Sequence, residues 1–275
     1  MRATFHTLFL FGGFFVGAIV LSHIQRISLA MLKKMIGYHG MLAISAIGVV
    51  VHETGHLLMC WVFGHKVQKV RFFSPNQASG SLGYVNHSYN PDSFYQQIGN
   101  FFIGVGPIFS ATLCLYLILF YGLNVDMGKA IEGVAGIASA SISVQAEQTM
   151  MVTQYALLNL WAFVAKQPIL GLVVVIGITS IAIHAAPSRS DMQGALKGSI
   201  VLLSFIIIWT LVASFGKELI GNQEFNQWTD AANHFLRQGE IALLGIMGFI
   251  LIWATVSLIA ISAMFILWKG VKRSL

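Results

Sequence analysis

Charged side chains are rare in this chain of 275 residues, where aspartate, glutamate, lysine and arginine together make up only 9%. Hydrophobic residues make up 56%, and the mean hydropathy is +0.76. A water-soluble domain of this size does not need so much apolar surface. The shortage of charge therefore argues against a soluble domain and predicts an all-α polytopic protein embedded in the lipid bilayer.

A concentrated basic surface is also missing, although the formal net charge is +6. The lysines and arginines are scattered near the ends of apolar runs, and no basic run carries interleaved aromatic residues. We therefore expect no nucleic-acid partner and interpret these residues as topology determinants and headgroup contacts. The two cysteines, Cys60 and Cys114, both fall in apolar runs. They are expected to be small packing residues rather than a disulfide or a metal pair.

Polar segments divide the chain into about six apolar runs that can cross a bilayer as helices. These runs comprise residues 7–22, 41–63, 98–121, 168–186, 196–215 and 241–268. The first run lacks a convincing cleavage site, so we expect it to be retained, with an uncleaved signal-anchor as the alternative. Gln25-Arg26 and Lys33-Lys34 mark a short polar connection after it, and residues 216–238 are predicted to form a polar loop. A single domain over residues 1–275 is predicted, with a core at about 41–215.

The second apolar run contains the motif HExxH, formed by His52, Glu53 and His56. Two histidines four residues apart on a helix lie about 40° apart around its axis, so both can face one metal ion. Glu53 is the next residue around the helix and can reach a water bound to that metal. The motif is typical of zinc sites with two imidazole ligands and a glutamate base. A chance occurrence is the bland alternative, but ionisable groups in an apolar run are costly without a function.

The polar segment after this run, from Gly64 to Gln97, carries the pattern of a β-hairpin. Residues 66–72 alternate basic and apolar side chains, and residues 80–87 are the expected partner strand. Turn residues lie between them, at Ser74-Pro75-Asn76. The hairpin either merely connects two runs or offers an edge to an extended substrate. In the second case the candidate contact residues are Val67, Lys69 and Arg71.

The third run contains Gly106 and Pro107, which predict a break in the middle of its helix. A proline there leaves a backbone carbonyl without its hydrogen bond and bends the helix. The break is either a plain kink or a second place where an unwound substrate is held.

A catalytic zinc normally has three protein ligands and one water, so a third ligand is needed. The candidates are His65, His87, Asp92, His184 and Asp191. The first two lie in the polar hairpin, where histidine is unremarkable. His184 ends an apolar run and can be a satisfied buried histidine. Asp191 follows a proline where a helix restarts, and its alternative role is a helix N-cap.

Three features together resemble the site-2 protease family of intramembrane zinc metalloproteases (M50 class, nearest to its M50B-like branch). They are the motif at Val51–His56, the stretch Gly64–Val67 with the polar segment after it, and Gly106-Pro107 in the next apolar run. The resemblance covers residues 41–121 and about 179–198. It implies a zinc site within the membrane, nearer the cytoplasmic face.

The family's second motif is an Asn-x-x-Pro stretch leading to an Asp-Gly pair, whose Asp is the third zinc ligand. In this chain His184-Ala-Ala-Pro187 and Asp191 fall in the corresponding place, with one residue fewer between them, and Met192 replaces the Gly. The usual Asn after Gly-Pro is absent, and Ser110 is nearest to its place. The resemblance implies that Asp191 is the third ligand. His184 is then a reserve ligand, a residue that contacts a ligand, or part of the substrate site.

Topology constrains this ligand set. If the end of the run 41–63 and the segment Pro187–Asp191 lie on the same side of the membrane, the chain must cross the membrane an even number of times between them. The runs 98–121 and 168–186 give two crossings, so the short apolar segment 153–165 is expected to lie at the interface or re-enter. With six crossings, one face holds nine of the 16 lysines and arginines, which favours a cytoplasmic location for both termini and the hairpin.

We therefore predict a zinc-dependent endopeptidase that cleaves transmembrane protein substrates in a bacterial inner membrane. His52, His56 and Asp191 hold Zn²⁺, and Glu53 takes a proton from the water and gives it to the leaving amine. The alternative is a metal-binding membrane transporter or assembly factor without peptidase activity. A transporter needs ionisable groups in several spans, and beyond His184 the remaining runs carry almost none.

Overall fold

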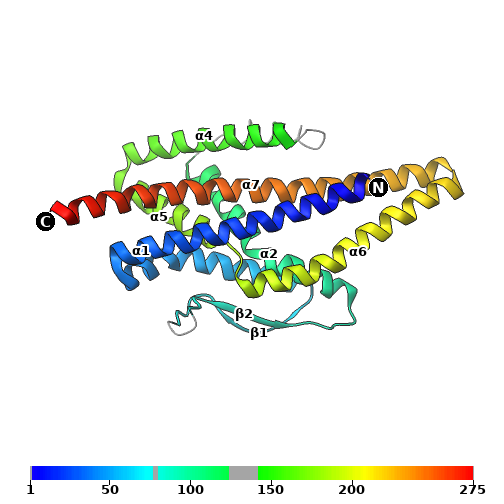
Figure 1. The fold of residues 1–275 in the computed structure, drawn as a ribbon, viewed down its shortest axis with the longest axis horizontal. Coiled ribbons are helices and arrows are strands. Elements are labelled where there is room, and N and C mark those ends of the chain that lie inside the picture. The colour runs from blue at the N-terminus through cyan, green and yellow to red at the C-terminus, as the bar shows by residue number, and fades with distance from the viewer. Residues whose placement is uncertain (1, 77–79, 124–141, 275) are drawn as a thin grey trace.

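The computed structural model describes residues 2–76, 80–123 and 142–274. About 85% of the structure is helical, and a two-stranded antiparallel sheet follows the first helix, which confirms the predicted helical protein with a hairpin (Figure 1). The elements are α1 (Arg2–Val62), β1 (Lys66–Arg71), β2 (Tyr84–Ser88), α2 (Phe94–Leu117), the π-helical turn η1 (Ile118–Gly122), α4 (Ile142–Lys166), α5 (Pro168–His184), α6 (Arg189–Ile220) and α7 (Gln223–Ser274).

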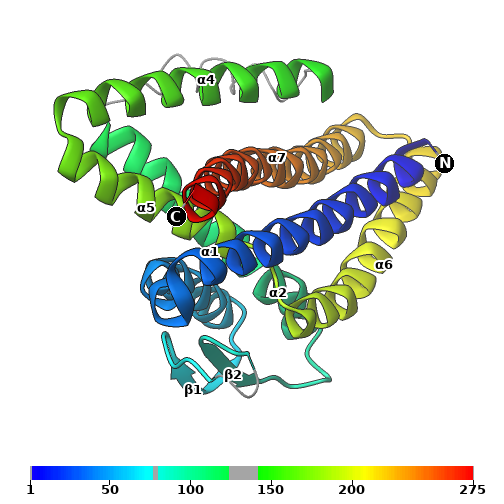
Figure 2. The same ribbon diagram turned by 60° about the vertical axis from the view of Figure 1, so that its left-hand side comes forward.

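Long apolar helices make up most of the fold. Within the described ranges, four helices are long and apolar enough to cross a membrane, namely α1 from Thr7, α2, α6 and α7, the last up to Arg273. The apolar helix α5 is shorter, and α4 lies outside this group. Figure 2 shows α4 at the edge of the molecule, where it contacts α5 and α7. Cys60 is buried, Cys114 is half-buried, and both are free thiols, as predicted.

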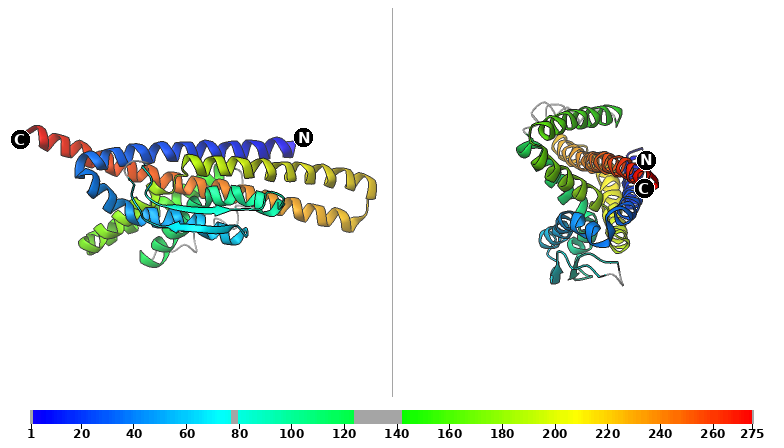
Figure 3. Two further views of the ribbon diagram at one scale, coloured as in Figure 1. Left: turned by 90° about the horizontal axis from the view of Figure 1, so that it is seen from below. Right: turned by 90° about the vertical axis from the view of Figure 1, so that its left-hand side faces the viewer.

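Helix α1 consists of two halves that meet at Gly37, whose backbone has φ 74° and ψ 178°. Only glycine adopts this conformation readily, so this residue permits the sharp kink. After it the chain turns back alongside the first half (Figures 1 and 3). The predicted polar connection is wrong in its conformation, because Gln25-Arg26 and Lys33-Lys34 continue the first helical half. Glutamine, lysine and arginine are good helix formers, and nothing stops the helix before Gly37.

The predicted polar loop at residues 216–238 is also wrong, because it is helical except for a tight turn between α6 and α7. Gly221 makes the turn with φ 60°, which favours glycine. Two polar contacts join the two helices. Trp209 Nε1 donates to Asn233 Oδ1 over 2.9 Å, and Lys217 pairs with Asp230. Figure 1 shows these two helix ends projecting together from the rest of the molecule.

Glycines bring the second half of α1 into direct backbone contact with α2 and α5. A Cβ atom on Gly55 would overlap the carbonyl group of Gly106 in α2, and a Cβ on Gly106 would overlap that of Gly55. Similarly, a Cβ on Gly48 would overlap the carbonyl group of Ser180 in α5. The Gly48 amide donates to the Ser180 hydroxyl over 2.8 Å. Small residues thus allow the helix that carries HExxH to approach two neighbours closely.

Two more glycines hold α2 against α6. A Cβ on Gly104 would overlap the Asp191 carbonyl oxygen, and a Cβ on Gly198 would overlap the backbone nitrogen of Phe101. Helix α2 is continuous through Pro107, so the predicted break is wrong. The proline lies buried in this close packing, which supports the helix on both sides.

The hairpin has the predicted antiparallel pairing, which joins Lys66 to Ser88 and Arg71 to Tyr84. A register shift lies between Val67 and Lys69. The second strand begins at Tyr84, later than the predicted residue 80, and the segment before it stays close, since the Ser74 amide donates to the Leu82 carbonyl over 2.7 Å. Figure 2 shows the hairpin beside the second half of α1.

Two glycines four residues apart on α6 test the role of close helix contact. We expect Gly198→Ala to lower the stability by about 1–3 kcal/mol, because the added methyl group must displace the α2 backbone. The control is Gly194→Ala, where the nearest atom is 3.9 Å away and a small gain is expected. Thermal unfolding in detergent, followed by circular dichroism, measures both. Equal midpoints for the two variants would contradict the predicted packing.

Candidate metal centre

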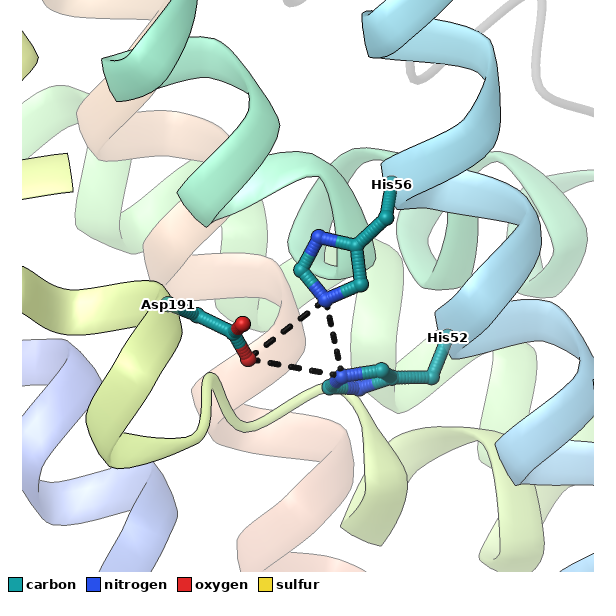
Figure 4. A group of neighbouring side chains, drawn as sticks. All are labelled: His52, His56 and Asp191. Carbon is teal, nitrogen blue, oxygen red and sulfur yellow. Dashed lines mark hydrogen bonds and ion pairs between the residues drawn. The ribbon is translucent and has the colours of Figure 1, made fainter. Parts of the chain in front are cut away.

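Three side chains from two distant helices converge at one point, as Figure 4 shows. His52 and His56 come from the second half of α1, and Asp191 comes from the first turn of α6. The His52 and His56 Nε2 atoms are 3.2 Å apart, and they lie 3.6 Å and 3.4 Å from Asp191 Oδ2. This group can hold a metal ion.

The three distances agree with those between ligand atoms around a small tetrahedral ion. For bonds of about 2.0–2.1 Å, two ligands at tetrahedral positions are about 3.3–3.4 Å apart. The separations of 3.2, 3.4 and 3.6 Å lie around that value. Two neutral imidazole nitrogens that face each other this closely repel unless a proton or a cation lies between them. The residues present therefore fit a metal with two nitrogen ligands and one oxygen ligand.

The proline in α2 provides the hydrogen-bond acceptor that orients His56. Pro107 has no N–H, so the carbonyl of Ile103, four residues earlier, lacks its partner within the helix. His56 Nδ1 donates to this carbonyl over 2.7 Å. With the proton on Nδ1, the lone pair on Nε2 points toward Asp191. The sequence predicts this free carbonyl, but no local pattern connects it to the two histidines.

The end of α5 orients His52 in the same way. His52 Nδ1 donates to the backbone carbonyl of His184 over 2.7 Å, at a helix end where carbonyls lack partners within the helix. His184 thus contributes through its backbone, and its ring lies outside the converging group. The ring Nδ1 donates to the Ser180 carbonyl, and Nε2 is buried without a hydrogen-bond partner in the described structure. Hydrogen bonds of this kind fix the tautomer of metal-binding histidines.

Asp191 lies in the capping box of α6 and also faces the two histidines. The N-cap of α6 is Ser188, and Asp191 is the third helical residue, so the N-cap interpretation of Asp191 was wrong by three residues. The two form a capping box: the Ser188 amide donates to Asp191 Oδ2 over 2.7 Å, and the Asp191 amide donates to Ser188 Oγ. The cap fixes the orientation of the carboxylate so that Oδ2 also faces the two histidines.

A cavity of about 750 Å³ opens at this group, and Glu53 lines it beside His52 and His56. Glu53 is only 6% exposed. The hairpin covers it closely, because a Cβ on Gly83 would come within 2.8 Å of Glu53 Cγ. The cavity therefore brings together a metal-binding group, a carboxylate and a segment of extended chain.

Of the two strands, β2 lines the cavity that contains His52, His56 and Asp191, which we call the metal group. Residues 80–87 line the cavity without interruption, whereas Val67, Lys69 and Arg71 lie on β1 and are not among the described lining residues. Gly106 and Pro107 lie at the crossing of α1 and α2 and are also outside that lining. His184 is in it. Asn100 and Arg26 also line the cavity and were not predicted, since only the folded chain places their helices beside the motif.

Two of the other ligand candidates form a pair in the hairpin. His65 Nδ1 lies 3.0 Å from His87 Nδ1, and His87 is one of the cavity-lining residues. Burial lowers the pKa of the His87 imidazole to about 4, so the ring is neutral near pH 7. Asp92 lies exposed in the turn before α2, with its amide bonded to Asn90 Oδ1.

Comparison of the chain with protein-family models, with curated proteins and with solved structures found no match. The chemistry of the site is therefore argued from its own residues. Two oriented imidazoles, one capped carboxylate and a second, buried carboxylate are a combination suited to metal-assisted hydrolysis.

Pro107→Ala tests whether the proline sets the metal affinity. The new N–H competes with His56 for the Ile103 carbonyl, so we expect zinc to bind about tenfold more weakly while the helix content is kept. The control is Pro168→Ala, because that proline begins α5. Competition with a chromogenic chelator on the purified protein measures the affinity. Unchanged zinc binding in Pro107→Ala would show that the freed carbonyl does not orient His56.

Proposed function

We propose that the protein is a zinc-dependent intramembrane endopeptidase that resembles the site-2 protease family. One observation carries the proposal. His52 Nε2, His56 Nε2 and Asp191 Oδ2 lie within 3.6 Å of one another, and the buried Glu53 lines the same cavity. These residues lie on helices that are apolar enough to cross a membrane, or at the start of one.

The donor set favours zinc over harder cations. Two imidazoles and one carboxylate are typical of catalytic zinc sites, whereas magnesium and calcium prefer oxygen ligands throughout. When bound, zinc would supply a Lewis acid that lowers the pKa of a bound water toward about 7 and polarises a carbonyl.

Glu53 is the residue that we assign to proton transfer. Its neighbours in the HExxH turn, His52 and His56, are committed to carbonyls and to the metal group, which leaves Glu53 as the base. The carboxylate would accept a proton from the attacking water and return it to the amine that leaves. Because Gly83 packs over the side chain, the hairpin keeps bulk water away from this exchange.

The substrates in this proposal are segments of transmembrane proteins. A helix conceals its carbonyls in hydrogen bonds, so the segment must unwind before it can be attacked. An unwound segment needs partners for its backbone groups, and extended chain is a suitable one. We place the substrate beside residues 80–87, which line the cavity, instead of beside β1 as the alternating pattern first indicated.

The proposed environment of the protein is a lipid bilayer. We propose that the apolar helices are surrounded by lipid and that the protein lies in a bacterial inner membrane, as the resemblance implies. Support comes from the large apolar side chains that are exposed on these helices, among them Ile208 at 60%, Leu219 at 84% and Ile266 at 68%. Exposure of this extent in water would be unfavourable for a protein of this size.

A metal transporter without peptidase activity is the competing function. The structure adds one ionisable residue that favours it, because Glu240 in α7 is buried and accepts a hydrogen bond from Thr7 over 2.6 Å. However, Glu240 lines a separate small cavity among Phe11, Phe14 and Phe101. His52, His56 and Asp191 line the other cavity. The two cavities share no lining residue among the described residues, so they do not form one continuous path.

Glu53→Gln tests the proposed reaction. We expect this variant to keep its zinc but to lose cleavage by at least about a hundredfold, because the amide cannot accept the proton of the water. The measurement is immunoblotting of tagged single-span membrane proteins co-expressed with each variant, together with the zinc content of the purified protein. Glu218→Gln, which changes an exposed glutamate on α6, is the control and should cleave normally.

Two outcomes would contradict the proposal. Normal cleavage by Glu53→Gln would exclude Glu53 as the base. Zinc uptake into proteoliposomes by the wild-type protein, without cleavage of any co-expressed substrate, would favour the transporter.

A further inference from the structure

A chain of hydrogen bonds leads from α2 through the hairpin to the cavity. His65 Nε2 lies 2.8 Å from the carbonyl oxygen of Gln96, and His65 Nδ1 lies 3.0 Å from His87 Nδ1. His65 is 5% exposed, and the ring of Tyr89 stacks on it with centroids 5.1 Å apart. Both imidazoles are therefore held in place, and one of them, His87, lines the cavity that also contains His52, His56 and Asp191.

The direction of each bond follows from the acceptors. A carbonyl cannot donate, so His65 Nε2 must carry the proton that is shared with Gln96. In a neutral His65 ring this leaves Nδ1 as an acceptor. His87 Nδ1 must then carry the proton between the two rings. The remaining nitrogen of a neutral His87, Nε2, therefore has a free lone pair.

The position of His87 suits peptide binding. His87 ends the run of residues 80–87 that lines the cavity, and His56 and Asp191 line the same cavity. An unwound peptide next to the metal group presents backbone N–H groups that need acceptors, because the interior offers no water to replace them. A lone pair at the cavity wall meets that need.

We propose that His87 is a substrate-binding residue whose Nε2 accepts a backbone N–H of the extended peptide, and that His65 is a positioning residue that fixes its tautomer. This inference rests on the proposed peptidase function and adds a specific contact to it. The ligand is an unwound peptide segment. It has a free amide N–H next to the carbonyl group that would face the metal.

A second metal site at the two histidines is the competing explanation. Two ring nitrogens 3.0 Å apart are also close enough to share an ion. However, no third histidine, cysteine, aspartate or glutamate among the described residues joins His65 and His87. The described residues form one such group of three, which is His52, His56 and Asp191. The hydrogen bond accounts for the short distance without an ion.

The tautomer can be measured without any peptidase activity. Long-range proton–nitrogen NMR of the zinc-loaded protein in micelles, labelled with ¹⁵N-histidine, distinguishes Nδ1–H from Nε2–H rings. We expect the His87 signal, assigned by its loss in His87→Gln, to be of the Nδ1–H type. In His65→Leu, which removes the acceptor, His87 should change to the Nε2–H form, and in His65→Asn, which keeps an acceptor oxygen, it should not. An Nε2–H ring in the wild type would overturn the inference.

A pair of probes tests the contact itself. One is a peptidyl hydroxamate, and the other is the same compound with the amide nitrogen nearest the hydroxamate methylated. We expect the wild type to bind the N–H compound about tenfold more tightly, which is the effect of one hydrogen bond. In His87→Ala this preference should fall toward one, while His234→Ala, which changes an exposed histidine on α7, should keep it.

The outcomes separate this inference from the proposed function. An equal preference in wild type and His87→Ala would overturn the assigned contact, even if Glu53→Gln abolishes cleavage. Conversely, normal cleavage by Glu53→Gln would refute the role of Glu53 as the base, while a preference that depends on His87 would still show that its ring binds an amide N–H.

Discussion

Close backbone contact between helices is the constraint on which the metal group depends. His52 and His56 meet Asp191 only because α1, α2 and α6 approach at glycines, and each added methyl group at those crossings would overlap a backbone atom of the neighbour. Gly55 lies inside the HExxH turn, so the residue that permits the contact is part of the motif. Gly104 lies against the Asp191 carbonyl oxygen. Close packing at these glycines and the convergence of the three side chains are therefore two consequences of the same crossings.

Carbonyl groups that lack a partner within their helix orient the two histidines. The carbonyl of Ile103 is free because Pro107 lacks an N–H, and that of His184 is free because α5 ends there. Each carbonyl accepts a hydrogen bond from Nδ1–H of one histidine over 2.7 Å. The Nε2 atom of that histidine therefore keeps its lone pair. An apolar protein has few polar groups to spare, so irregular points in helices are efficient sources of acceptors. The same logic extends to the Ser188–Asp191 capping box, where a helix start holds the third side chain.

The hairpin closes the centre from outside the helices. Gly83 packs on Glu53, and the run of residues 80–87 borders the cavity. His65, at the entry to β1, and His87, near the end of β2, are linked across the hairpin. The short polar segment between α1 and α2 thus does more than connect them. It covers the buried carboxylate and lines the cavity with extended backbone, which the long apolar helices cannot provide.

Some of this arrangement was determined by the sequence alone. Apolar runs, alternating residues with turn residues between them, and the HExxH spacing are local patterns. They predicted, in that order, the helices, the hairpin and the shared face of His52 and His56. Asp191 came from a resemblance, and the structure brings it to the two histidines. Local patterns could not show that Gly37 reverses α1 or that residues 216–238 stay helical, because polar residues suit a helix surface as well as a loop. Local patterns also could not show that β2, and not β1, borders the cavity. Nor could they show that Pro107 frees the carbonyl that accepts from His56, because both features depend on which distant backbone segments are in contact. Only tertiary structure decides such contacts, because they arise from packing between segments that the sequence keeps far apart.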